Sequence, residues 1–116
     1  MGKPAYDYIP KDSEIPELYA QEDKGEEAIV YIKLFTPDAN WTWYLTEYRP
    51  SEELAFGLVD GHEVELGYVS IAELKSIKGP IGLPIERDLY WVPKTIREVK
   101  ESLESRTDYP EGWGGE

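Results

Sequence analysis

Two stretches in the first half of the chain have the apolar pattern of β-strands. Residues 28–35 read Ala-Ile-Val-Tyr-Ile-Lys-Leu-Phe, a β-branched and aromatic run that is typical of a mostly buried strand. Residues 41–48 alternate instead, with Trp41, Trp43 and Leu45 on one face and Thr42, Tyr44, Thr46 and Tyr48 on the other. Because both sets contain large side chains, both faces of this second strand can be covered.

A third apolar run, residues 54–59, ends at the dipeptide Asp60-Gly61, which is the clearest turn signal in the chain. Asp-Gly between apolar runs favours a two-residue type I′ hairpin, because both turn positions need positive φ. This turn would fix the register of the next strand. The expected cross-strand pairs on one face are Val59 with His62, Gly57 with Val64, and Ala55 with Leu66, and those on the other are Phe56 with Glu65 and Leu58 with Glu63.

Helices are predicted from their start signals. Pro16 suits the first position of a short helix over residues 16–20, since its missing N–H would be unpaired there anyway. Capping boxes of the Ser/Thr-x-x-Glu type begin at Ser70 and Thr95. The first box predicts a two-turn helix that stops at Gly79. The second predicts a helix with a narrow apolar stripe formed by Ile96, Val99 and Leu103.

The elements together predict an α+β fold. Residues 85–92 alternate well enough to form a last strand, which gives a mostly antiparallel sheet of about five strands with two or three short helices packed on it. The length of 116 residues fits one domain. We assign residues 1–14 to an extended N-terminal arm, residues 15–106 to the single domain and residues 107–116 to a disordered tail.

Composition narrows the function classes. The chain has 24 acidic and 12 basic residues, a formal net charge of −12, no Cys and one His. The missing Cys excludes disulfides, thiol catalysis and the usual Cys/His zinc sites. The negative charge disfavours direct binding of nucleic acid or of an anionic membrane. No apolar run reaches the length of a membrane span or a secretory signal, so we expect a cytoplasmic protein.

Candidate chemistry gathers near the predicted turns, but no known motif organises it. The sequence has no phosphate-binding Gly-rich loop, nucleophile elbow, His-Glu-x-x-His or calcium loop, so we expect no cofactor, no metal site and no assigned catalytic residue. Clustered carboxylates can serve acid–base chemistry, bind a hard cation or simply face water, and the two Trp side chains can form a ligand platform or part of the core. The candidate binding surface consists of Asp38, Asn40, Trp41, Trp43, Glu63, Glu65, Glu86, Arg87 and Asp88.

Four segments carry a resemblance to a known family. They are the run from Leu34 to Tyr44, the tetrapeptide Phe-Gly-Leu-Val at residues 56–59, Glu63 with Glu-Leu-Gly-Tyr at residues 65–68, and the run from Gly82 to Tyr90. Over about residues 15–92 the chain resembles an uncharacterised bacterial family that is catalogued only as a domain of unknown function. The resemblance implies a setting on plasmids, phages and conjugative elements, sometimes within larger proteins with DNA-processing domains. It implies no activity and no residue roles.

The leading hypothesis is a non-enzymatic acidic interaction protein of a mobile genetic element. Its carboxylates would imitate DNA phosphates and occupy the basic groove of a host defence or DNA-processing protein. A rival hypothesis is a small enzyme or ligand-binding domain, which predicts a concave pocket of carboxylates and aromatic side chains. A third is an accessory docking domain. The oligomeric state stays open.

Overall fold

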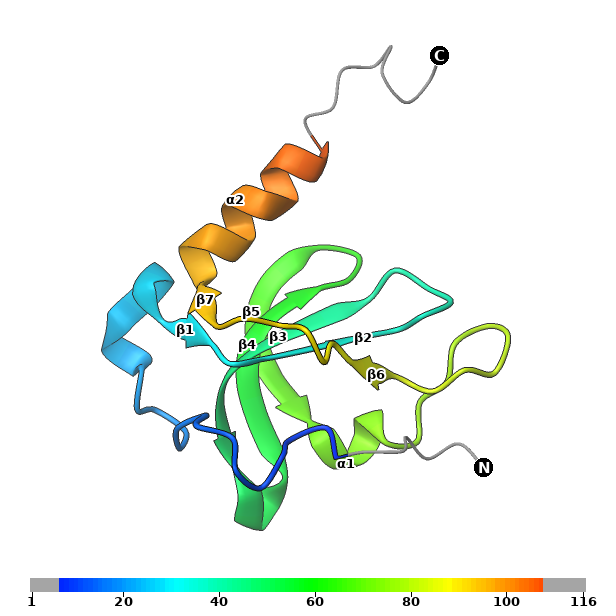
Figure 1. Cartoon of the computed structure of the whole chain (residues 1–116), viewed down its shortest axis with the longest axis horizontal. Coiled ribbons are helices and arrows are strands. Elements are labelled where there is room, and N and C mark those ends of the chain that lie inside the picture. Colours follow the sequence, from blue (N-terminus) through cyan, green and yellow to red (C-terminus); the bar gives the residue numbers. More distant parts are fainter. Residues whose placement is uncertain (1–6, 108–116) are drawn as a thin grey trace.

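The computed structural model describes residues 7–107 and confirms the α+β prediction. Its main feature is a five-stranded antiparallel sheet with the strand order β5-β4-β3-β2-β6 (Figure 1). The strands are β2 (Ile32–Phe35), β3 (Thr42–Arg49), β4 (Leu54–Asp60), β5 (Val64–Ser70) and β6 (Glu86–Arg87). Strands β5 and β6 therefore form the two edges of the sheet.

Smaller elements surround this sheet. β1 (Ile29–Val30) pairs antiparallel with β7 (Lys94–Thr95) in a separate two-stranded sheet. The helical segments are η1 (Glu22–Glu27), η2 (Pro50–Glu52), α1 (Ile71–Leu74) and α2 (Ile96–Thr107). Within residues 7–107, no helix is both long enough and apolar enough to cross a membrane. Residues 1–6 and 108–116, which hold most of the predicted disordered tail and part of the predicted arm, lie outside the described residues.

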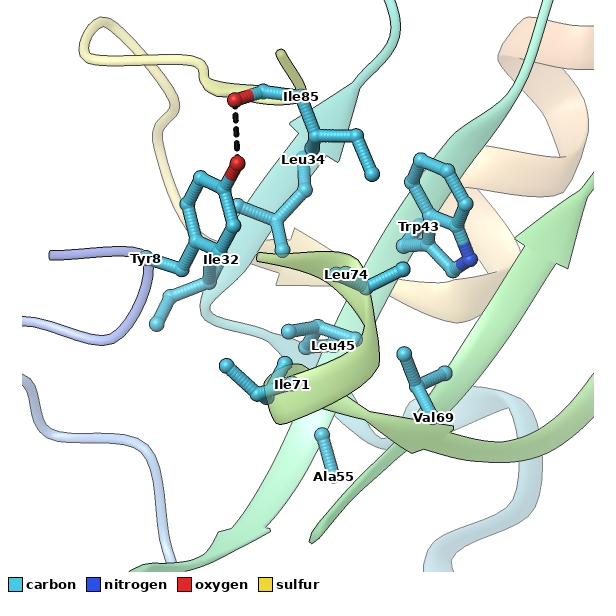
Figure 2. Packing of buried hydrophobic residues seen from close by; sticks show 10 residues of the cluster. All are labelled: Tyr8, Ile32, Leu34, Trp43, Leu45, Ala55, Val69, Ile71, Leu74 and Ile85. Carbon is cyan, nitrogen blue, oxygen red and sulfur yellow. Dashed lines mark hydrogen bonds between the residues drawn. The ribbon is translucent and has the colours of Figure 1, made fainter. Parts of the chain in front are cut away.

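Both faces of β3 are covered, as its alternation predicts. On one face Trp43 and Leu45 belong to a first core, and on the other face Tyr44 belongs to a second core. The first core, drawn in Figure 2, consists of Tyr8, Ile32, Leu34, Trp43, Leu45, Ala55, Val69, Ile71, Leu74 and Ile85. The second core consists of Ala28, Val30, Tyr44, Leu58, Ile96, Val99 and Leu103, with Trp91 packed against it. Helix α1 therefore covers one side of the sheet and α2 the other.

The N-terminal segment takes part in the first core through Tyr8. Its side chain is 2% exposed, and its hydroxyl donates a hydrogen bond of 2.5 Å to the backbone carbonyl of Ile85 (Figure 2). A buried hydroxyl needs such a partner, because leaving it unpaired costs about 1–3 kcal/mol. The bond joins two segments that are 77 residues apart in sequence.

A β-bulge in β3 fixes the approach to η1. The pairing with β4 shifts between Leu45 and Glu47, which turns the buried Glu47 carboxylate towards the segment before η1. There its two oxygens accept hydrogen bonds from the backbone amides of Tyr19 at 2.8 Å and Gln21 at 2.7 Å. The bulge also corrects one expectation: Tyr48 packs against the first core and does not share the face of Tyr44.

The predicted register of the β4–β5 hairpin is wrong. Asp60 pairs with Val64 and Val59 pairs with Glu65, so the loop holds three residues, 61–63, and every predicted pair is displaced. The physical reason is that Asp60 continues β4, where it also pairs with Thr42 of β3, and so cannot serve as a turn position. The observed register pairs Leu58 with Leu66 and Phe56 with Tyr68, and the rings of Phe56 and Tyr68 meet edge-to-face at 5.1 Å.

Two predicted strands are shorter than expected. The run 28–35 is divided at Tyr31, whose amide donates to the Leu45 carbonyl, so its halves β1 and β2 join different sheets. The run 85–92 keeps only β6, because Asp88 begins a turn: its carboxylate accepts from the amide of Tyr90, and its carbonyl accepts from the amide of Trp91.

Two predicted helices also differ from the observed structure. Residues 18–21 form turns, and the expected helix over residues 16–20 does not form. Helix α1 begins at its predicted cap, where the Ser70 hydroxyl accepts from the Glu73 amide, but it ends after four residues. The Ser76 hydroxyl bonds to the Glu73 carbonyl, and the Ser76 and Ile77 amides bond three residues back, so the segment tightens into turns.

We predict that Gly57→Ala destabilises the protein. A Cβ at this position would lie 2.0 Å from the Tyr44 carbonyl oxygen, which belongs to the backbone of the neighbouring strand and cannot move away alone. Overpacking of this kind costs about 1–3 kcal/mol, or more. Urea denaturation should therefore show a lower free energy of unfolding. The control is Gly67→Ala at the paired position in β5, where a Cβ meets nothing within 4 Å; an equal loss there would contradict the packing argument.

The second capping box is confirmed and yields another prediction. The Thr95 hydroxyl accepts from the Glu98 amide at 3.1 Å, and the Glu98 carboxylate accepts from the Thr95 amide at 2.9 Å. Thr95→Ala should lower the free energy of unfolding by about 1 kcal/mol, because a helix cap is lost. Thermal denaturation of the variant and of the unmodified chain measures this difference in stability. Ser105→Ala, on the exposed surface of the same helix, should leave stability nearly unchanged, and a stable Thr95→Ala variant would show that the box is redundant.

Candidate functional site

An open hollow of about 840 Å³ lies beside β2, at the end of the sheet where the turn between β2 and β3 meets the segment that follows β6. Four parts of the chain line it: β2, the turn at residues 36–41, the ends of β3 and β4, and residues 86–90. Its walls consist of Lys33, Phe35, Thr36, Ala39, Asn40, Trp41, Thr42, Asp60, Gly61, Glu86, Arg87, Asp88, Leu89 and Tyr90. Segments far apart in sequence thus meet around one concave surface.

The turn at residues 36–41 is closed by Thr36. Its buried hydroxyl accepts from the Trp41 amide at 3.0 Å, while its own amide donates to the Trp41 carbonyl. Asp38 points away from the hollow, towards the loop at residues 79–84. There its carboxylate accepts from the Ile81 amide at 2.9 Å, and a Cβ on Gly79 would lie 1.5 Å from the other oxygen. Asp38 therefore holds two loops together.

Three carboxylates line the hollow in different surroundings. Asp60 is 7% exposed at the end of β4. Asp88 lies 3.6 Å from the Lys33 ammonium group, which also lies over the rings of Tyr44 and Trp91. Glu86 sits opposite Phe35 in the β2–β6 pair, and its side chain forms no hydrogen bond or ion pair with any residue in the range 7–107. Glu86 is thus the carboxylate that the fold does not use.

Aromatic side chains form the rest of the walls. Trp41 is fixed in place: its ring stacks on Trp43 with 6.1 Å between centroids, contacts His62 edge-on at 5.3 Å, and packs so closely on Gly61 that a Cβ there would lie 2.2 Å away. Tyr90, by contrast, is 92% exposed at the opposite wall. The hollow therefore combines one closely packed ring with one that is almost fully exposed.

The structure brings together five of the nine candidate residues. Asn40, Trp41, Glu86, Arg87 and Asp88 line the hollow. Their role in binding stays a prediction.

The other four candidate residues lie elsewhere. Trp43 is buried in the first core, and Asp38 joins two loops. Glu63 and Glu65 are exposed near the β4–β5 hairpin, and Glu63 precedes the strand that was expected to contain it. The anticipated pair of carboxylates on one face of a strand therefore does not form there.

Nine of the residues that line the hollow were not among the candidates, and four of these nine have charged or aromatic side chains: Lys33, Phe35, Asp60 and Tyr90. Lys33 carried a signal, because it is the single charge within the apolar run 28–35. The signal at Asp60 was misleading, because the Asp60-Gly61 dipeptide was interpreted as a two-residue turn. Within residues 7–107 no group of three or more His, Asp or Glu side chains has an arrangement that could hold a metal ion.

Comparison with protein families gives one match. A family model described as "Protein of unknown function (DUF2958)" matches residues 14–100. This segment contains every residue that lines the hollow. Comparisons with curated proteins and with solved structures found no significant match.

Asp88 provides a test of how the hollow is built. Asp88→Ala removes both the ion pair with Lys33 and the acceptor for the Tyr90 amide, and should lower the free energy of unfolding by about 1–2 kcal/mol. Asp88→Asn keeps an acceptor for that amide and loses only the partly exposed ion pair, so its cost should stay below about 1 kcal/mol. Urea denaturation compares the two. Equal losses would show that the turn does not depend on the side chain.

Proposed function

We propose that this chain, which belongs to the DUF2958 family of proteins of unknown function, is a non-enzymatic interaction protein whose hollow receives arginine side chains of a basic protein partner. The observation that carries the proposal is the Glu86 carboxylate, which has no partner of its own among residues 7–107 and lies in a concave site with Asp60 and the exposed Tyr90 ring.

A guanidinium group suits these walls better than other cations. It is planar, it forms two parallel hydrogen bonds to a carboxylate, and it stacks on aromatic faces. An ammonium group offers only a compact point charge. The volume of about 840 Å³ exceeds what one side chain fills, so the hollow has room for neighbouring residues of the partner as well. Recognition would thus involve a short segment that contains arginine.

The charge of the whole chain supports a basic partner. A net charge of −12 raises the rate of encounter with positively charged surfaces and makes the association sensitive to salt. Part of this charge is already neutralised: Glu26 and Glu27 pair with Arg97, and Glu26 also pairs with Lys100. The hydrogen bond to Lys100 lowers the pKa of Glu26, so this carboxylate keeps its charge to a lower pH than an ordinary Glu. Glu86, which forms no ion pair within residues 7–107, remains available to a cationic group of a partner.

The partner that we propose is a host defence or DNA-processing protein with a basic groove. Carboxylates of this chain would take the place of DNA phosphates in that groove. The family resemblance supports this choice through its setting on plasmids, phages and conjugative elements, with the interaction taking place in the cytoplasm. The concave shape and the aromatic walls of the hollow are also what the rival hypothesis of a small enzyme or ligand-binding domain predicts. We favour the interaction role over an enzymatic one because the residues that line the hollow include no His, Ser or Cys, and His62 lies outside it beside Trp41.

The test uses the full chain and synthetic peptides of alternating Gly with Arg, Lys or Glu. Isothermal titration calorimetry at low salt should show the Arg peptide binding most tightly, the Lys peptide more weakly, and the Glu peptide not at all. Glu86→Gln should weaken the Arg peptide about tenfold, since a charge-assisted bond is worth about 1.5–3 kcal/mol. Tyr90→Ala should weaken it further by removing the stacking face.

The matched control is Glu73→Gln, the same change of charge at an exposed position on α1. It should leave binding almost unchanged. Equal weakening by Glu73→Gln and Glu86→Gln would mean that only the overall charge attracts the peptide. Absence of binding of the Arg peptide at low salt would end the proposal, and tight binding of a small neutral compound in its place would favour the ligand-binding alternative.

A further inference from the structure

Strand β5 exposes an apolar stripe at the edge of the sheet. Val64, Leu66 and Tyr68 alternate along the strand and share the face that carries Leu58 and Phe56 on β4. Their side chains are 45%, 51% and 54% exposed. Among the described strands only β4 pairs with β5, so the outer backbone groups of β5 face no neighbouring strand (Figure 1).

The stripe continues into a small apolar pocket. Leu66, Tyr68 and Phe56 line a space of about 200 Å³ together with Tyr19 and Ile96 at the start of α2. The Tyr68 hydroxyl donates to the Tyr19 hydroxyl at 3.1 Å, and this hydrogen bond raises the pKa of Tyr68. The stripe therefore borders a formed cavity, into which a side chain from outside can insert.

Edge strands are normally protected against pairing with other chains by Pro, Lys, a bulge or a cover. β5 has no Pro and no Lys, and its pairing with β4 is regular from Leu54–Ser70 to Asp60–Val64. Its only charge is Glu65. An exposed, regular, apolar edge seven residues long is a template for an added strand.

We infer that β5 is the docking edge for an extended segment of a partner protein, in which apolar side chains alternate with basic ones. The apolar positions would lie beside Val64, Leu66 and Tyr68, and the basic positions would lie on the opposite face, beside Glu65. Glu63 before the strand and Glu22 at the rim of the small pocket add to the negative charge around this edge.

Charge complementarity selects this occupant over a second copy of the chain. A parallel, in-register pairing of two β5 strands would place Glu65 of each beside that of the other, and any pairing would bring together two bodies with a net charge of −12 each. Like charges across a strand pair are destabilising. A basic segment, by contrast, would be attracted by the carboxylates of Glu63 and Glu65. The inference does not rest on the hollow, because no residue of β5 lines it.

The test is an amide NMR titration of the full chain with two peptides of the same composition, Gly-Val-Lys-Val-Lys-Val-Lys-Gly and Gly-Val-Val-Val-Lys-Lys-Lys-Gly. The alternating peptide should shift the amide signals of β5 and slow the hydrogen exchange of its outer amides, whereas the block peptide should bind at least tenfold more weakly. Leu66→Thr should weaken the alternating peptide about tenfold, because an apolar contact is lost from the stripe.

Matched variants separate this edge from other sites. Ile81→Thr changes an apolar side chain that is 74% exposed on a different loop, and it should leave binding unchanged. Glu86→Gln in the hollow should also leave it unchanged, so the two proposals can fail separately. Glu65→Lys should weaken the Lys-containing peptide and favour its Glu-containing counterpart.

Three results would overturn the inference: equal binding of the alternating and block peptides, unchanged binding by Leu66→Thr, or peptide-induced shifts confined to residues outside β5. Sedimentation of the free chain supplies a fourth. A dimer that dissociates in Leu66→Thr would show that the edge pairs with its own copy and not with a basic segment.

Discussion

The burial of β3 on both faces is the constraint on which the rest of the fold depends. A strand that carries Trp43 and Leu45 on one face and Tyr44 on the other cannot lie on the surface of a one-layered sheet. Segments from distant parts of the chain therefore pack on each face. Tyr8 and α1 complete the first core, and β1, Trp91 and α2 complete the second. The small pairing of β1 with β7 follows from this need, because it brings the start of α2 onto the second core.

The same cover decides where the protein can meet other molecules. On the second face, the buried cluster that contains α2 includes Tyr44 of β3 and Leu58 of β4 but no residue of β5. Beyond Leu58 the stripe on β5 is exposed. On the other side of Tyr44, towards β2, polar side chains cover this face. The Lys33 ammonium group lies over the rings of Tyr44 and Trp91 and pairs with the carboxylate of Asp88. The apolar edge and the polar hollow are thus the two ends of one incompletely covered face.

Some short-range features could be predicted from the sequence, although the helix over residues 16–20 and the length of α1 could not, and the long-range strand register was predicted wrongly. The capping box at Thr95 and the alternation around Tyr44 were visible because all their determinants lie within a few residues. The hairpin register failed because Asp60 is held in β4 by Thr42, a partner 18 positions away that no local rule includes. The hollow was predicted only in part, because it too depends on contacts between segments that are distant in sequence. Residues near one turn, such as Asn40 and Trp41, could be grouped, but their meeting with Glu86 depends on the pairing of β2 with β6.

Acidity in this chain serves more than one purpose, and only part of it is available to a partner. The Glu47 carboxylate accepts hydrogen bonds from two backbone amides. Glu26 and Glu27 of η1 form ion pairs with Arg97 and Lys100 of α2. The carboxylates that remain available to a partner include Glu86 at the β6 edge and Glu65 at the β5 edge. Five strands have four spacings of about 4.8 Å, so these edges are on the order of 19 Å apart. A segment that pairs along β5 runs along that edge of the sheet, so its paired residues stay four strands away from Glu86. The two surfaces therefore suit two separate elements of a basic partner, an added strand and an arginine-bearing loop, and neither depends on the other for its contacts.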